Sequence, residues 1–200
     1  MKKILLLFCL ISVLILTGCA SESIHIQSIE SVPYKAASTA GFARGVKLAV
    51  SDFSLATGKP AKTVGEAKTG MFNIATPVVV DQAVNALVMD AVANGLKAVG
   101  VVLLPPPEAD FRVVGMVEKL WVEEYATGWS MEYAKAHVKF EIYVHNSKGD
   151  IVWAKSLEQF KTSGKSPDAT ADDLPTLKLA LEEAVRSLIE DADFWQAISK

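Results

Sequence analysis

The stretch HVKFEIYVH, residues 137–145, decides the fold of this chain, because it alternates apolar and polar side chains without a break. Such alternation predicts a β-strand with one buried and one wet face. The buried side chains are Val138, Phe140, Ile142 and Val144. The turn sequence Asn-Ser-Lys-Gly at 146–149 follows, with Gly149 where a hairpin needs a positive φ. We therefore expect this strand to be the middle of an antiparallel meander.

Two more strands complete the predicted meander. Phe111–Glu124 precedes the quoted strand, and its alternation changes phase near Glu118 and Lys119, which indicates a β-bulge. The middle strand begins at Trp129 and ends at His145, and the third runs over Ile151–Phe160. Because one face of such a sheet is wet, the other needs a covering layer.

Amphipathic helices supply that layer. The first is expected over Pro77–Asn94, with Thr76 as its cap and proline at the first helical position. The second is expected over residues 173–191. Their apolar stripes recur at helical spacing; they are Val80, Val84, Leu87, Val88, Ala91 and Val92 in the first, and Leu177, Ala180, Leu181, Ala184 and Leu188 in the second. The fold class is α+β, an antiparallel sheet with two amphipathic helices on one face, a two-layer sandwich.

Shorter elements fill the first half of the chain. Val46–Val50 alternates as a strand and points Val46, Leu48 and Val50 at the core, with Asp52 continuing the same phase where we expect the strand to end. A hairpin arm is expected around residues 62–68, and a short apolar strand over Val99–Leu104.

The N-terminus has the layout of an exported lipoprotein. Two lysines precede an apolar run that is too short to span a bilayer, which takes about 20 residues. The run ends in Leu16-Thr17-Gly18-Cys19, which resembles the box at which bacterial lipoproteins are lipidated and cleaved. We predict a signal peptide over 1–18 and acyl chains, palmitate among them, on Cys19. Two or three long chains would attach the protein to a membrane lastingly.

Three regions follow from this reading. Residues 1–18 are the signal, 19–45 hold the lipidated cysteine and a tether with an edge strand near its start, and 46–200 form a single α+β domain. Cys9 is lost with the signal, so no disulfide is available. The net charge of −3 becomes more negative after cleavage. An acidic domain argues against nucleic acid as a partner.

Several short motifs together resemble a known family. Val50-Ser51-Asp52, Val64-Gly65, Gly95-Leu96 before an apolar strand, and Ala109-Asp110 at the start of the meander are similar to the pattern of YajG-like bacterial lipoproteins. A more distant resemblance is to auxiliary lipoproteins of lipid-transport systems. These resemblances imply an outer-membrane lipoprotein that faces the periplasm, without an assigned catalytic activity.

The residues indicate no catalytic or metal site, and we expect neither an enzyme nor a cofactor. His137 and His145 lie eight residues apart on one strand, about 26 Å, so they cannot share an ion. No G-x-S-x-G elbow or P-loop is present. The adjacent acids at 123–124, 172–173 and 182–183 are expected to be solvated surface, and Asp52 to organise a turn toward Gly58.

Aromatic residues crowd the meander and form the candidate binding surface. They are Trp121, Tyr125, Trp129, Tyr133 and Trp153. Cross-strand packing explains such a group without a ligand, and a contact surface is the functional alternative, with Trp129 near a hairpin tip as its anchor. We expect a non-catalytic envelope lipoprotein that binds a protein partner or a lipid; the alternative is an envelope hydrolase with an unrecognised site.

Overall fold

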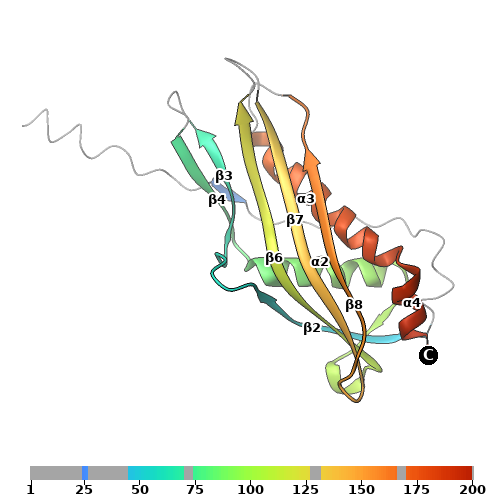
Figure 1. Ribbon diagram of the computed structural model, residues 1–200. Helices are drawn as coiled ribbons and strands as arrows, with labels where there is room; N and C mark the ends of the chain where they lie inside the picture. The colour runs from blue at the N-terminus through green and yellow to red at the C-terminus, as the bar shows by residue number, and fades with distance from the viewer. Residues whose placement is uncertain (1–23, 27–44, 70–73, 127–131, 166–169, 200) are drawn as a thin grey trace, which may run out of the picture.

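One mixed β-sheet backed by helices makes up the described part of the chain, residues 24–26, 45–69, 74–126, 132–165 and 170–199 of this computed structural model (Figure 1). The strands are β1 (Ile24–Ile26), β2 (Lys47–Leu55), β3 (Thr63–Thr69), β4 (Ile74–Val80), β5 (Val102–Leu103), β6 (Phe111–Ala126), β7 (Glu132–Asn146) and β8 (Ile151–Thr162). The helices are α2 (Val84–Ala98), α3 (Thr170–Ile189) and α4 (Ala192–Ile198), with a 3-10 turn at Pro106–Glu108 after the prolines.

The predicted meander is confirmed. β6 pairs antiparallel with β7, and β7 with β8. The four apolar residues of β7 predicted to be buried are each fully buried. The register of β6 against β7 shifts between Val117 and Lys119, so the predicted bulge is present at Glu118. The alternation of apolar and polar residues was thus sufficient to predict the central strands of the sheet.

The second edge of β6 makes the sheet mixed and not antiparallel as predicted. β2 pairs in parallel with β6 up to Val117, and β3 pairs in parallel with it at Val122 and Glu123. β5 runs parallel to β2, and β1 runs parallel to β4 at the far end. Parallel pairing needs crossover connections, and here α2 lies in the chain between β2 and β6. β6 therefore changes partner halfway along one edge.

The first helix begins later than predicted. Thr76 and Pro77 lie in β4, where they pair with Ala67 and Glu66 of β3, and so they do not cap a helix. The β-branched run in β4 favours a strand, and the predicted hairpin arm is the β3–β4 pair. α2 starts at Val84 and continues through Gly95 to Ala98. Its predicted stripe from Val84 to Val92 is buried.

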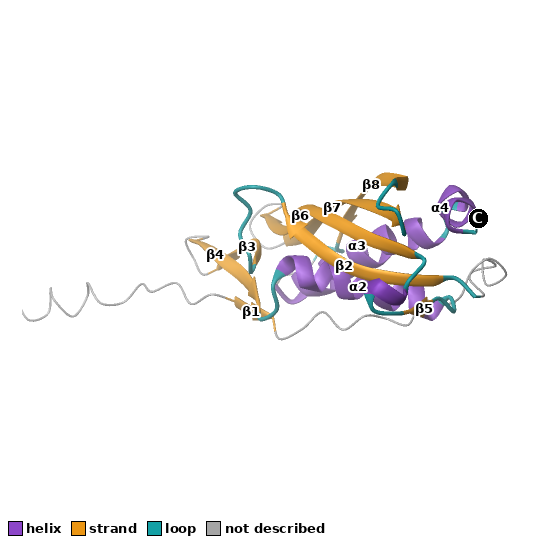
Figure 2. Ribbon diagram, turned by 90° about the horizontal axis from the view of Figure 1, so that it is seen from below, coloured by secondary structure: helices purple, strands orange, loops and turns teal. Residues whose placement is uncertain are grey.

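The helices form one layer on one face of the sheet (Figure 2). α2 contacts β2 and β6, α3 contacts β6, β7 and β8, and the two helices contact each other. Every predicted stripe residue of α3 is buried. A third helix, α4, was not predicted; Asp191 caps it by accepting a hydrogen bond from the Phe194 N–H at 2.8 Å. No described helix covers the opposite face of β6 and β7 (Figure 1).

A polar seam joins the edge strand β8 to the C-terminal helices. Three side chains of β8 that point toward the helical layer each reach one residue there. Lys155 pairs with Asp191 at 2.5 Å, Gln159 with Ser187 at 3.2 Å, and Lys161 with Glu183 at 2.5 Å. Lysines that point inward from an edge strand discourage pairing with further strands, and the seam gives them partners.

Two predictions about acidic residues are wrong. Asp52 is exposed and does not end its strand, because β2 continues across an irregularity at which Asp52 takes φ 56° and meets Arg112 at 3.5 Å. One member of each adjacent acid pair is buried instead of solvated; these are Glu124, Asp173 and Glu182. Adjacent residues of a strand point to opposite sides, so one residue of such a pair in β6 had to face the helical layer. Glu124 accepts a hydrogen bond from the backbone N–H of Lys68.

Candidate functional site

Aromatic rings from three strands form a row on the open face of the sheet. The register places Trp121 of β6 opposite His137 of β7, and His137 opposite Phe160 of β8. The rings of His137 and Phe160 stack, with centroids 4.1 Å apart and planes 22° apart. Phe160 is 54% exposed. A large apolar ring so exposed on a sheet face is available for contact with another molecule.

A second ring pair extends the row toward the end of the hairpin. Tyr125 and Tyr133 lie opposite each other, with ring centroids 5.4 Å apart and an interplanar angle of 16°. Both are half-buried. We call the five residues Trp121, Tyr125, Tyr133, His137 and Phe160 the aromatic face.

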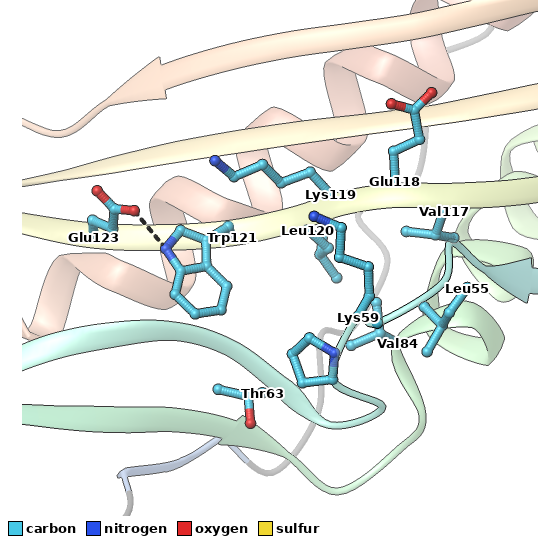
Figure 3. A pocket seen from close by; sticks show the side chains of 12 residues that line it. Leu55, Lys59, Thr63, Val84, Val117, Glu118, Lys119, Leu120, Trp121 and Glu123 are labelled. Atoms are coloured by element: carbon cyan, nitrogen blue, oxygen red, sulfur yellow. Dashed lines mark hydrogen bonds between the residues drawn. The ribbon is translucent and has the colours of Figure 1, made fainter.

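Glu123 fixes two of these rings. Its carboxylate accepts hydrogen bonds from Trp121 Nε1 at 2.7 Å, drawn in Figure 3, and from Tyr125 Oη at 2.6 Å. The Tyr125 hydrogen bond is the main cause that lowers the pKa of Glu123; burial opposes it, and the Trp121 hydrogen bond, Lys119 and Lys135 add to it. The same bond raises the pKa of Tyr125. Glu123 therefore stays ionised and holds both rings in one orientation.

Polar contacts link the aromatic face to charged residues around it. His137 Nε2 lies 2.7 Å from Glu158 of β8, and Lys139 Nζ lies 2.7 Å from Glu118 at the bulge. The hydrogen bond to Glu118 raises the pKa of Lys139. An aromatic centre with a charged rim is the composition of protein contact surfaces.

The structure brings together three of the five predicted aromatic residues. Trp121, Tyr125 and Tyr133 share the open face, but Trp153 does not. Its ring points to the helical layer and meets Phe194 edge to face at 5.3 Å. Trp153 is opposite the inward-facing Val144, so its inclusion in the surface was wrong. Trp129 and Cys19 lie outside the described residues.

Sequence reasoning missed His137, Phe160 and Glu123. The alternation of the sequence predicts His137 as an exposed polar residue of its strand, and Phe160 only as the residue at which the third strand ends. The register of β7 against β8 brings them together, and it shifts between Val144 and His145 just beside the turn. Counting outward from the turn without this shift would place Phe160 one residue away from its partner.

The described residues hold no cluster of three or more potential metal ligands. Among these same residues, no helix is long and apolar enough to cross a bilayer. The aromatic face instead brings together several rings, two of which are held by hydrogen bonds to the Glu123 carboxylate. That arrangement suits binding.

Comparison with known proteins gives fold likenesses and no sequence match. No family model and no curated protein matches the chain. A crystal structure from Xanthomonas campestris, assigned to the family model DUF330, is 14% identical, with a TM-score of 0.60 over 88% of this chain and 96% of that one. An uncharacterized protein is 11% identical, with a TM-score of 0.57 over 84% and 97%. These two likenesses show a shared fold alone.

Bacterial lipoproteins are also among the structural neighbours. A minor lipoprotein from Acinetobacter baumannii is 9% identical, with a TM-score of 0.41 over 76% of this chain and 90% of that one. A likeness as loose as this does not bear on the fold or on the site.

Proposed function

We propose that this protein is a non-catalytic lipoprotein of the bacterial envelope that binds a protein partner through its aromatic face. In this proposal acyl chains on Cys19 hold it to the outer membrane, and the domain faces the periplasm, as in the YajG-like lipoproteins that its motifs resemble. The coincidence of an export signal with the sequence Leu16-Thr17-Gly18-Cys19 supports the anchor.

The exposed stack of Phe160 on His137 is the observation that carries the binding role. Aromatic residues dominate the energetics of protein interfaces. Trp121 and Tyr125 are already fixed by Glu123, so a partner would lose little side-chain entropy by ordering them. A flat ring-bearing sheet face fits a protein surface better than it fits the chains of a lipid, which need a concave site.

Site-specific photocrosslinking in cells tests the partner. A benzophenone amino acid replaces Phe160, and in a matched control it replaces Leu179 of α3, which is 53% exposed. We expect a discrete crosslinked protein band from position 160 and none of the same mass from position 179. The same band from both positions, or no protein band from position 160, would contradict the proposal.

Metabolic labelling with a palmitate analogue tests the anchor. Cys19→Ala should abolish incorporation, because it removes the thiol that accepts the lipid. Labelling of the variant at the wild-type level would show that the protein carries no lipid on Cys19.

A further inference from the structure

A pocket lies where β6 changes partner. The pairing of β6 with β2 ends at Val117, and its pairing with β3 begins at Val122. No described strand pairs with residues 118–121 on that edge. The connection from β2 to β3 passes around the gap, turning at Gly58, whose φ is 78°. A pocket of about 330 Å³ occupies this gap (Figure 3).

The pocket has an apolar floor and one aromatic wall. Val84 of α2 and Val117 and Leu120 of β6 form the floor. The indole of Trp121 lies in the gap, on the side toward β3 (Figure 3). Its Nε1 is bonded to Glu123, so the ring is held in place. Small-molecule pockets combine an apolar lining with a few placed polar groups and measure about 300 to 1,000 Å³, which puts this one at the lower end.

The rim of the pocket carries two lysines without ion-pair partners. Lys59 and Lys119 form no salt bridge with any residue in the described ranges, although Lys119 is close enough to Glu123 to help lower its pKa. The two acids of the rim already have partners: Glu118 is bound to Lys139 and Glu123 to the rings. The lysines are thus the groups left to meet an incoming charge, and that charge must be negative.

We propose that this gap binds a single-chain anionic amphiphile, with the acyl chain on Val117, Leu120 and Trp121 and a carboxylate or phosphate head between Lys59 and Lys119. The volume has room for one chain and not for the two chains of a phospholipid. Burying the methylenes of a chain is favourable, so the apolar floor supplies affinity, and the two lysines select an anionic head group. Of the aromatic face, only Trp121 lines this pocket, so crosslinking at Phe160 tests the partner and the two lysines test this site.

Photolabelling of the full-length protein in phosphatidylcholine nanodiscs tests this site. The probe is decanoic acid with a diazirine in its chain, and adducts are mapped by mass spectrometry. We expect adducts within residues 55–63 and 117–123 and at Val84. The double variant Lys59→Gln/Lys119→Gln should reduce this labelling at least fivefold. The matched control Lys97→Gln/Lys148→Gln removes two exposed charges from α2 and the β7–β8 turn and should label like the wild type.

Two further arms address the head group and the fold. Decanol with the same diazirine should label the gap weakly, and to the same extent in both double variants. Decanoate and decyl phosphate are tested separately as competitors: competition by either supports the site and identifies its preferred head, and competition by neither overturns it. Equal labelling of the wild type and of a Lys59→Gln/Lys119→Gln variant with an unchanged circular dichroism spectrum would also overturn it. Adducts confined to residues that do not line the pocket would overturn it as well.

Discussion

Replacing Gly65 by alanine should measure how closely β3 is held against β6. A Cβ at this position would lie 2.2 Å from the carbonyl oxygen of Val122 and 2.7 Å from its Cγ1. Ordinary contact begins at 3.4 Å, so the two strands must separate by about 1.2 Å. The nearest atom belongs to the backbone, so no side-chain rotation relieves the clash.

The cost of Gly65→Ala follows from two opposing effects. Overpacking costs about 1 to 3 kcal/mol, and the upper end applies because backbone must move. Alanine recovers about 0.5 to 1 kcal/mol by restricting the unfolded chain. The net loss is close to 2 kcal/mol, or about 4 to 8 °C in Tm for a domain of this size. Among the described residues, β3 pairs with β6 at Gly65 and Glu66, so the clash falls directly on this pairing.

Alanine substitutions at two other glycines should give graded losses of stability for comparison. At Gly115 a Cβ would lie 2.5 Å from the ring of Phe53, a side chain that can shift, so Gly115→Ala should cost less than Gly65→Ala. At Gly164 nothing lies within 4 Å, so Gly164→Ala should leave stability within about 0.5 kcal/mol of wild type. Thermal unfolding followed by circular dichroism gives the order. A Tm of Gly65→Ala equal to that of Gly164→Ala would refute the close approach of β3 to β6.

Three more predictions concern the core, the polar seam and the aromatic face. Leu87→Ala should cost about 2 to 5 kcal/mol in urea unfolding, because Leu87 is only 5% exposed; an unchanged midpoint would mean that Leu87 is not in the core. Burial raises the pKa of Asp191, but hydrogen bonds, chiefly from Lys155, lower it overall, so Asp191 should stabilise the fold above about pH 4 and lose this effect as the pH falls below that value. Asp191→Asn should therefore make the free energy of unfolding depend less on pH in the acid range, and an acid slope equal to that of the wild type would contradict this prediction. Tyr125→Phe should raise the pKa of Glu123 in a carboxyl NMR titration, because it removes the largest cause that lowers it; an unmoved pKa would show that the hydrogen bond is absent in solution.

Periodicity in the sequence predicted the elements whose burial repeats regularly. β7 and α3 were assigned correctly because alternation and helical spacing reflect a face that is buried along its whole length. Thr76 and Pro77 gave a wrong helix start. A polar residue before proline is typical of the first turn of a helix, but here the pair lies within β4. Pairing with β3 decided the outcome, and local signals contain no information about such partners.

The candidate site was harder to predict because it depends on register. Trp121 and Tyr125 lie in the outward phase of β6, and Trp153 in the inward phase of β8. Shifting a strand by one residue exchanges its faces, so a bulge or a turn irregularity is enough to misplace an aromatic residue. The gap beside β6 arises from parallel pairing with two separate strands, a topology that an antiparallel expectation excludes.

Because of the polar seam, the edge strand β8 depends on the helices at the C-terminal end of the chain. Lys155 and Lys161 find their partners on helices that follow β8 in the sequence. Until those helices have docked, Lys155 and Lys161 of β8 have no partners, and the backbone edge of β8 is open to neighbouring chains. A protease that removes residues beyond 182 would take away both partners and leave β8 prone to aggregation, so chains truncated at the C-terminus should disappear from the soluble fraction before intact chains do.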